Sequence, residues 1–302
     1  KCISCGACVY QCPFGALSDK SFILDAIKLL KEEKHVYAIV APAIASQFAY
    51  AKLGQIVTGI KQLGFYEVVE AALGADMVAY AEAKELAEKG FLTSSCCPAF
   101  VSYVQKQFPA LAGNVSHNMS PMATIAKFIK GVDKEAKTIF IGPCTAKKGE
   151  AQMPGVREYV DCVMTFEELQ AVLDSREIDL TTLEETDLDN ASGFGRSFAR
   201  CGGLAEAAVE ALKEQGIDFE VKPVSCSGIE ECRLALLKAS KGRAEGNFIE
   251  GMACIGGCIN GAGCLTHGER NKNKIDAHSR QAKDKTIAES LHEAETGLEA
   301  AK

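Results

Sequence analysis

Short runs of consecutive apolar residues recur along the chain between segments with helical spacing. The runs that predict buried strands cover residues 36–44, 66–72, a stretch that ends at residue 93, 137–144 and 248–253. Strands that are apolar on both faces are typical of parallel sheets covered by helices. The pattern therefore predicts an α/β fold in which helices flank parallel sheets.

The segments between these runs have the polar and apolar spacing of helices. Ser21–Lys34 predicts a short amphipathic helix with Ser21 as its N-cap. A later helix places Glu82, Glu85 and Lys89 on one face, because residues three and four apart are neighbours on a helix. Taken alone, that face is most simply a solvated charged surface.

Composition narrows the class of protein. The chain has 302 residues, of which 47% are hydrophobic, so it can bury a substantial core in two or three domains or lobes. Its net charge of −7 and the lack of a basic tract argue against nucleic acid or an anionic membrane as partners. No apolar run is long enough to span a bilayer, and the N-terminus does not resemble a signal peptide. We expect a cytoplasmic protein.

The chain holds 14 cysteines, and they are clustered. A secreted disulfide scaffold would be short and poor in core residues, so reduced, metal-binding thiolates are the better interpretation. The first cluster is Cys2, Cys5, Cys8 and Cys12, followed directly by Pro13. This is the spacing of bacterial ferredoxins, whereas zinc sites more often use two separated pairs.

In two-cluster ferredoxins the fourth cysteine of this run binds the other cluster. A partner for Cys2, Cys5 and Cys8 would then lie upstream of Lys1. We therefore predict one or two 4Fe-4S clusters and interpret residues 1–20 as a ferredoxin-like segment that is truncated upstream.

Further cysteines stand where predicted strands end. Cys97 and Cys144 each follow a buried strand, while Cys254 and Cys258 follow the strand 248–253 with two glycines between them. Their spacing predicts that Cys254 and Cys258 share one face of a first helical turn. Because ligands bind beyond the carboxyl ends of parallel strands, the four thiols are expected to converge and hold a metal cluster. Each one alone would more simply be a buried core thiol.

These segments resemble the iron-only (FeFe) hydrogenases. That family carries Thr-Ser-Cys-Cys-Pro, Pro-Cys-x-x-Lys-x-x-Glu and Glu-x-Met-Ala-Cys-x-Gly-Gly-Cys motifs in this order. The corresponding stretches here are Thr93–Pro98, Pro143–Glu150 and Glu250–Gly263. The resemblance runs from Lys1 to about Arg270, and it implies a two-lobed domain that holds a hydrogen-converting iron cofactor, the H-cluster, between its lobes. We expect lobe 1 at 21–175, lobe 2 at 176–270 and a peripheral helical tail at 271–302.

The resemblance also implies roles for single residues. Cys97, Cys144, Cys254 and Cys258 would bind a 4Fe-4S cubane, and the Cys258 sulfur would bridge it to a two-iron subsite with CO, cyanide and azadithiolate ligands. Protein groups then tune and position this cofactor. Lys147 would donate to a cyanide. Ala41, Pro42, Ser94 and Met252 would line the pocket.

A proton route is implied as well, which changes the interpretation of the charged helix. By similarity, Cys96 would pass a proton to Glu82, then Ser116, then Glu85, with Lys89 at the outer end. Thiol, carboxyl and hydroxyl groups relay protons when hydrogen bonds or a water connect them. The resemblance therefore favours a relay over a merely solvated face.

The chain also departs from the family pattern. Gly142 stands where catalytic members usually have Met, Phe100 replaces Trp, Ile255 replaces Pro, and Ala262 interrupts a triple glycine. We expect the loss of Met to leave a looser or wetter pocket. Such features resemble the divergent sensory branch. The cysteines without an assigned role, which we expect to be buried thiols, are Cys162, Cys201, Cys226, Cys232 and Cys264.

Three hypotheses follow. The first is an enzyme, a slow hydrogenase that converts hydrogen reversibly to two protons and two electrons, which leave through the N-terminal cluster to ferredoxin or a signalling protein. The second is a non-catalytic sensor of hydrogen, CO or redox state with the same cofactor. The third is a hydrogenase-like iron-sulfur assembly protein, against which the Lys147–Glu150 motif and the relay residues argue.

Overall fold

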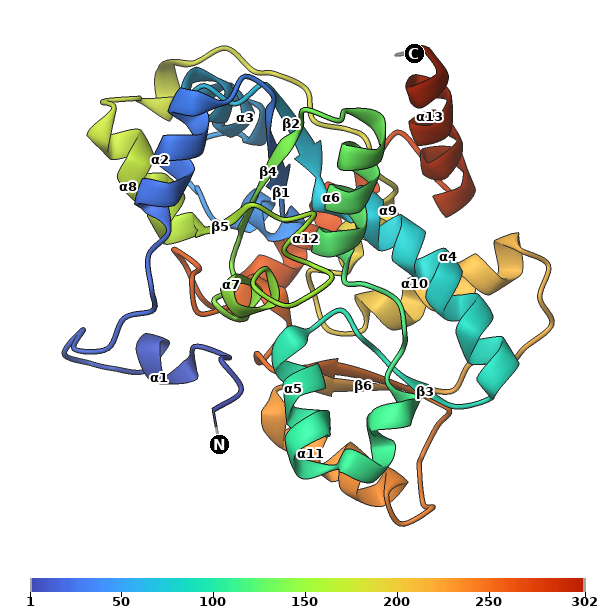
Figure 1. The fold of residues 1–302 in the computed structure, drawn as a ribbon. Helices are drawn as coiled ribbons and strands as arrows, with labels where there is room; N and C mark the ends of the chain where they lie inside the picture. The colour runs from blue at the N-terminus through green and yellow to red at the C-terminus, as the bar shows by residue number, and fades with distance from the viewer. Residues whose placement is uncertain (1, 301–302) are drawn as a thin grey trace.

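Two parallel sheets organise residues 2–300, which are the residues that the computed structural model describes (Figure 1). The larger sheet has the order β2-β1-β4-β5. Its strands are β1 (Val36–Val40), β2 (Glu67–Glu70), β4 (Lys137–Gly142) and β5 (Cys162–Thr165). The smaller sheet has the order β3-β7-β6, with β3 (Leu92–Thr93), β6 (Pro223–Ser227) and β7 (Phe248–Met252). All strand pairs are parallel, which confirms the predicted α/β class.

Helices cover these sheets. The larger sheet packs against α2 (Ile23–Glu32), α3 (Leu53–Gln62), α6 (Pro121–Val132) and α8 (Phe166–Ser175). The smaller sheet packs against α10 (Gly203–Glu214) and α11 (Ile229–Ala239), and α5 (Pro98–Gln107) lies on α11. The long helix α4 (Ala71–Lys89) contacts both groups of elements, including α6 and α10, and so connects the two lobes.

Short elements complete the fold. These are α1 (Ala7–Tyr10), η1 (Pro42–Ser46), η2 (Pro109–Asn114), α7 (Ala146–Glu150), η3 (Leu180–Thr182), α9 (Gly193–Ser197), η4 (Cys258–Asn260), α12 (Arg270–Arg280) and α13 (Ile287–Ala300). The N-terminal segment with α1 lies outside the two sheets, below α7 and beside α5 in Figure 1.

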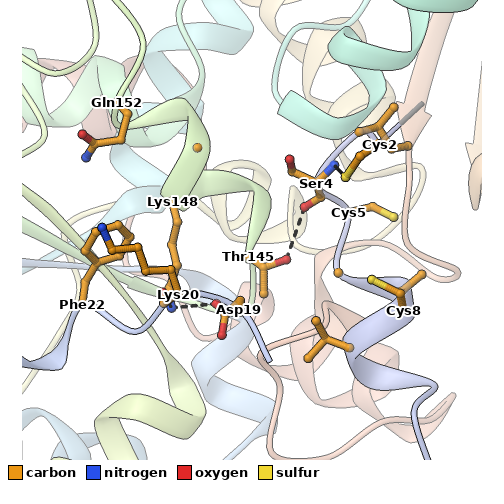
Figure 2. Close-up of a pocket in the computed structure, with 15 residues that line it drawn as sticks. Cys2, Ser4, Cys5, Cys8, Asp19, Lys20, Phe22, Thr145, Lys148 and Gln152 are labelled. Atoms are coloured by element: carbon orange, nitrogen blue, oxygen red, sulfur yellow. Dashed lines mark hydrogen bonds and ion pairs between the residues drawn. The ribbon is translucent and has the colours of Figure 1, made fainter. Parts of the chain in front are cut away.

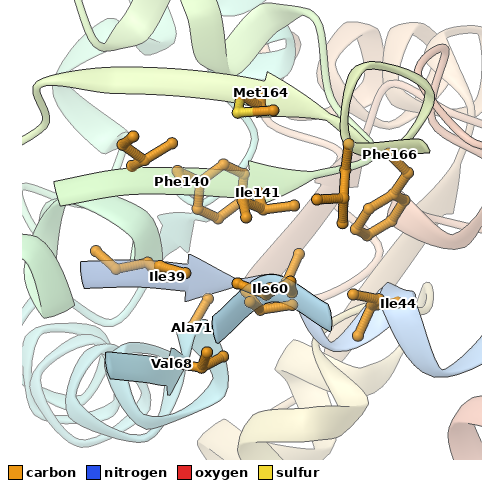
Figure 3. Close-up of a cluster of buried hydrophobic side chains, with 14 of the residues drawn as sticks. Ile39, Ile44, Ile60, Val68, Ala71, Phe140, Ile141, Met164 and Phe166 are labelled. Carbon is orange, nitrogen blue, oxygen red and sulfur yellow. The ribbon is translucent and has the colours of Figure 1, made fainter. Parts of the chain in front are cut away.

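The core of the larger lobe lies on both sides of its sheet (Figure 3). Ile39 on β1 and Ile141 on β4 are fully buried, and Phe166 at the start of α8 closes one end. Burying a side chain of this size contributes about 1.5–3 kcal/mol, so the uninterrupted apolar strands are what hold this sheet between helices.

The two lobes do not follow the predicted boundary at residue 175. β3 pairs with β7, and α5 packs in the same apolar cluster as β7, so residues 92–111 belong to the smaller sheet although they precede β4 in sequence. The chain therefore crosses between the lobes more than once. Sequence order alone gave no sign of this exchange, because β3 is only two residues long.

Several predicted elements have different ends. Phe22 rather than Ser21 is the N-cap of α2, and its side chain makes no capping bond. β1 ends at Val40, because Pro42 begins η1, and α4 starts at Ala71, earlier than its charged face suggested. The predicted peripheral tail is two helices, and α12 contributes the fully buried Ile275 to the core; residues 301–302 lie outside the described residues.

Candidate active site

A cavity lies where the carboxyl ends of strands from both sheets face each other. Its water-accessible volume is about 80 Å³. One wall comes from β1 and η1 through Ala41 and Pro42, and another from β7 through Met252. Most of the remaining lining is also apolar, including Ala71, Ala72 and Ala75 of α4 and Phe198 after α9. A cavity of this kind excludes water from any group that it holds.

Cysteines and Lys147 form the polar part of the lining. Cys97 follows β3, Cys144 follows β4, and Cys258 begins η4; all three line the cavity. Cys254 is not part of the lining, but its charge neighbours are Cys144, Cys97 and Cys258, so the four thiols form one group. Burial raises the pKa of the Cys144 thiol to about 11, and the nearby Cys97 adds to that rise.

This group does not have the geometry of a single-ion site. Among residues 2–300, no three His, Cys, Asp or Glu side chains lie close enough together to hold one metal ion. Thiols that surround a multi-iron cluster lie farther apart than the ligands of one ion. Because a thiol must lose its proton to bind a metal, loading such a site releases protons from groups whose pKa is raised.

The turn between Cys254 and Cys258 is not the predicted helical turn. Gly256 and Gly257 have φ angles of 81° and 101°, which L side chains rarely adopt. A Cβ on Gly257 would lie 2.7 Å from the backbone nitrogen of Cys201. The two glycines therefore let the chain turn sharply against the neighbouring segment before Cys258, and a helical spacing argument does not apply.

Lys147 brings a buried cation to the same cavity. It lies on α7, is 8% exposed, and lines the cavity beside Cys144. Its Nζ donates to Glu150 Oε2 at 2.8 Å and to the backbone oxygen of Cys96 at 3.3 Å. Burial lowers the pKa of Lys147, but the Glu150 carboxylate more than offsets this and keeps the ammonium charged.

Cys96 also lines the cavity, and the fully buried Glu82 lies near it. Glu82 on α4 is fully buried; its Oε1 accepts from the backbone nitrogen of Ser95 at 3.3 Å, and its Oε2 has no partner within the described residues. Burial raises the pKa of Glu82 to about 8, although the nearby Ser116 hydroxyl opposes the rise. Burial and the charge of Glu82 raise the pKa of Cys96 well above its usual value.

The chain of polar groups continues to the surface through Glu85. Ser116 Oγ donates to Glu85 Oε2 at 3.0 Å, and Asn118 Nδ2 donates to the same oxygen at 2.9 Å. Lys89 Nζ and His117 Nδ1 lie 2.7 and 2.8 Å from Glu85 Oε1. Burial alone would raise the pKa of Glu85, but the bonds from Lys89 and Ser116 hold it below its usual range.

His117 and Asn118 were missed as members of this site. They directly follow Ser116 in sequence, and that position was the only sign that they belong to the site. A His and an Asn without metal-ligand spacing are common on loops. The structure brings them onto a carboxylate of α4 that is more than 30 residues away in sequence. Sequence spacing does not contain that pairing.

The model of the iron-only hydrogenase large subunit, C-terminal domain, matches residues 34–262, which is most of the chain. The chain belongs to the iron-only hydrogenase large-subunit family. A 4Fe-4S binding domain model matches residues 1–18. Both matches support iron-sulfur cofactors in this protein.

Similar proteins carry two kinds of name. Iron hydrogenase 1 of Clostridium pasteurianum is 31% identical over 87% of this chain and 56% of its own length. The cytosolic Fe-S cluster assembly factor NAR1 of Eremothecium gossypii is 29% identical over 59% of this chain and 43% of its length. The chain thus spans about half the length of these relatives.

Solved structures support the same fold. A variant of the FeFe-hydrogenase HydA1 from Chlamydomonas reinhardtii superimposes with a TM-score of 0.75 at 22% identity, over 91% of this chain and 93% of that chain. This match confirms the predicted two-lobed fold.

Two predictions for the pocket wall of this hydrogenase domain need correction. Ser94 is fully buried but is not part of the cavity lining; its hydroxyl accepts from the backbone nitrogen of Gly251 at 3.1 Å. Gly142 does not leave the wall open, because the ring of Phe140 lies 2.5 Å from where a Cβ on Gly142 would be. The expectation of a looser or wetter pocket is wrong on this side.

The other departures from the hydrogenase pattern also have neighbours. The Phe100 ring lies directly over Gly251, within 2.2 Å of where a Cβ there would be. The Ala262 methyl would lie 2.4 Å from a Cβ on Gly6. Ile255 is 76% exposed. Its Cγ1 would lie 2.9 Å from a Cβ on Gly228.

The N-terminal cysteines form a second site on the hydrogenase domain (Figure 2). Cys2, Cys5 and Cys8 line a cavity of about 710 Å³ that α7 closes on the other side, whereas Cys12 is not part of this lining. Thr145 Oγ1 donates to the backbone oxygen of Ser4 at 3.3 Å, as Figure 2 marks. The separation of Cys12 agrees with the ferredoxin pattern in which the fourth cysteine serves another cluster.

The two groups of cysteines are neighbours. A charge on Cys5 contributes to the raised pKa of Cys254. Lys106 Nζ donates to the backbone oxygen of Cys2 at 2.6 Å, and Tyr10 stacks on His267 with ring centroids 4.0 Å apart. These contacts fix the N-terminal segment against the hydrogenase domain.

The remaining cysteines are core residues for the most part. Cys162, Cys226, Cys232 and Cys264 are buried, as predicted, and Cys201 is partly exposed. None of the helices in the described part of the chain has the length and apolar character required to cross a bilayer.

Proposed function

We propose that this protein is an FeFe hydrogenase that converts hydrogen reversibly to two protons and two electrons at an H-cluster. The observation that carries the proposal is the series of groups that leads from the thiol-lined cavity through Cys96 and Glu82 to Ser116 and Glu85. Within the described residues Glu82 Oε2 has no partner, so a water would bridge it to its neighbours. A cluster-binding site alone needs the thiols. Only a site that moves protons needs the buried carboxyl and hydroxyl groups behind them.

The residues present fit an anionic iron-sulfur cofactor. The four cysteines Cys96, Cys97, Cys144 and Cys258 line a largely apolar cavity that also holds a buried ammonium. Lys147 Nζ has three hydrogens to donate, and the described residues give it two acceptors, Glu150 and the Cys96 carbonyl. A third donor thus remains for a group in the cavity, and a cyanide ligand is an acceptor of the right charge.

In this proposal Cys97, Cys144, Cys254 and Cys258 would hold a 4Fe-4S cubane, and Cys258 would also hold the two-iron subsite. When bound, that subsite supplies the iron centre with CO, cyanide and azadithiolate ligands at which hydrogen is split or formed. Ala41, Pro42 and Met252 exclude water from it. Lys147 fixes its orientation.

Cys96 receives or delivers the proton at the cavity end. Its pKa and that of Glu82 are both raised, so both groups are protonated at neutral pH and each is able to donate. The unpartnered Glu82 Oε2 is the atom that a bridging water would contact. Glu85, held ionised by Lys89 and Ser116, is the outer acceptor.

Electrons would leave through the N-terminal cysteines. Cys5 lies near Cys254, so a 4Fe-4S cluster on Cys2, Cys5 and Cys8 would adjoin the cubane. The redox partner is proposed to be a ferredoxin or a signalling protein, with slow turnover in keeping with the substitutions at Gly142 and Ile255.

The test is to load the apoprotein with the two-iron cofactor and measure hydrogen evolution and oxidation. We expect CO and cyanide bands in the infrared spectrum and measurable turnover in both directions. Bands with a strong response to hydrogen but no turnover would favour the sensor. Absence of bands would reject both forms of the proposal.

An iron-sulfur assembly role is the second candidate, because relatives such as the NAR1 factor of Eremothecium gossypii carry that name. The retained Lys147–Glu150 pair and the buried relay carboxyl group of Glu82 argue against it, since cluster transfer has no need of either. Cluster transfer to an apo-ferredoxin, with no infrared bands after loading, would favour this candidate.

A further inference from the structure

Gly142 is the last residue of β4, and a glycine in a strand needs a reason because it has no side chain to pack. Its backbone does not supply one, since its φ is not in the left-handed region. Space does. A Cβ at residue 142 would lie 2.5 and 2.7 Å from two ring atoms of Phe140 and 3.1 Å from the Cβ of Ala41.

The Phe140 ring is confined on its other sides. Residues two apart on a strand point to the same face, so Phe140 and Gly142 share the face of β4 that looks toward the cavity. Ile39 on β1 and Val163 on β5 pair in register with Phe140, and both are almost completely buried. Figure 3 shows Ile39 and Phe140 on neighbouring strands.

The ring therefore has one direction left in which to move. Branched side chains occupy the neighbouring strands, and interiors are too closely packed to absorb a displaced ring. Any side chain at residue 142 would press the ring into the cavity that Phe140 already lines, next to Lys147 and Cys258. That cavity is about 80 Å³, so it has little volume to give.

We infer that Phe140 is the residue that sets the position of the cofactor on the β4 side, and that Gly142 is required to admit its ring. This inference rests on the proposed function, because it concerns the same cavity. The ring supplies a rigid apolar surface to the cavity that Lys147 also lines. It also excludes water from that side, since an aromatic face offers no strong hydrogen-bonding group.

The test compares cofactor uptake by Phe140 and Gly142 variants. Apoproteins are loaded with the two-iron cofactor, and iron content and infrared bands are measured before any assay of activity. Gly142→Ala is expected to lower uptake about tenfold, because overpacking of this size costs a comparable free energy. Phe140→Leu with Gly142→Ala is expected to restore uptake, because the shorter side chain leaves room for the added methyl group.

Phe140→Leu alone is expected to load and to shift the CO and cyanide bands, because it removes the ring from beside the cofactor. Gly131→Ala is the matched control, since a Cβ at residue 131 meets nothing within 4 Å. Its uptake and bands should equal those of the wild type.

Equal uptake and unchanged bands for Gly142→Ala would overturn the inference. If Gly142→Ala fails to fold, Phe140→Leu decides: shifted bands support the ring as the wall, and unchanged bands reject it. No uptake by the wild-type protein would instead reject the proposed function, so the two failures are distinguishable.

Discussion

The cavity is lined mainly by apolar residues, whereas the adjacent polar chain consists of groups that can exchange or share protons, namely Cys96, Glu82, Ser116 and Glu85. The cavity walls are mostly apolar, with one buried cation whose hydrogen bonds are largely satisfied by Glu150 and Cys96. The polar chain keeps a carboxyl oxygen of Glu82 without a partner, although leaving a buried polar group unpaired costs about 1–3 kcal/mol. Among the carboxyl groups of this polar chain in the described residues, only Glu82 has a buried oxygen without a partner.

This difference indicates two separate tasks. In the proposed function, an apolar site with fixed thiols holds a cofactor, and its residues act by staying in place. The polar chain, with raised and lowered pKa values at its two ends, would move protons, and its residues would act by changing protonation state. Variants on the two sides should therefore fail differently.

The largest effect is expected from removing a thiol of the cavity. Cys258→Ala should abolish the CO and cyanide bands and reduce iron content, because the cofactor loses the sulfur that would join its two parts. Cys162→Ala is the control, because Cys162 is a buried cysteine on β5 that does not line the cavity. Infrared bands at wild-type strength in Cys258→Ala would contradict its role.

The next effect is expected from Glu82→Gln, which keeps the shape of the side chain but cannot exchange a proton. Turnover should fall by roughly 10²–10⁴, the usual contribution of a positioned proton-transfer group, while the infrared bands stay unchanged. Glu88→Gln, on the exposed side of the same helix, is the control. If the bands are lost together with turnover, Glu82 helps to hold the cofactor site and its role in proton transfer is not supported.

Stability should depend on pH through the same carboxyl group. The pKa of Glu82 is about 8 in the folded protein against an ordinary value of 4.5, so the folded state binds more protons between these values. Stability is then highest below the ordinary value and falls as pH rises, by up to about 1.4 kcal/mol per pH unit. Denaturant unfolding of the apoprotein at several pH values should show this slope, and Glu82→Gln should reduce it. An equal slope in both proteins would contradict the raised pKa.

The smallest effect is expected at the exposed end of the chain. Lys89→Ala should raise the pKa of Glu85, because Lys89 helps to hold it low, and should slow turnover only about two- to threefold since His117 remains. Lys84→Ala on the exposed face of α4 is the control. A loss as large as that of Glu82→Gln would show that the relay does not pass outward through Glu85 as proposed.

The sequence predicted the parts of this comparison unequally. Uninterrupted apolar runs were enough for the parallel strands and the α/β class, because burial on both faces leaves a strong pattern. Motif spacing was enough to expect Cys97, Cys144 and Cys258 together. The contacts of His117 and Asn118 with Glu85 and the exchange of β3 into the smaller sheet were not predictable, since both depend on contacts between segments far apart in sequence.

The predictions for Gly142 and Ser94 were wrong because the sequence does not show how side chains pack against one another. The sequence shows Gly142 as a missing side chain, and only the packing shows that the Phe140 ring occupies its space. The family resemblance placed Ser94 in the pocket, but its hydroxyl accepts a hydrogen bond from the backbone nitrogen of Gly251 in the smaller sheet. Spacing along the chain does not tell which way such a side chain points.

Isotope exchange tests the central claim most directly, because it needs no electron partner. Wild-type protein loaded with the two-iron cofactor is placed under D₂ in ordinary water, and the formation of HD is followed. We predict HD formation by the wild type, and a rate lower by roughly 10²–10⁴ in Cys96→Ala with its infrared bands retained. No HD from wild-type protein that shows the bands, or equal rates in the two proteins, would contradict the account.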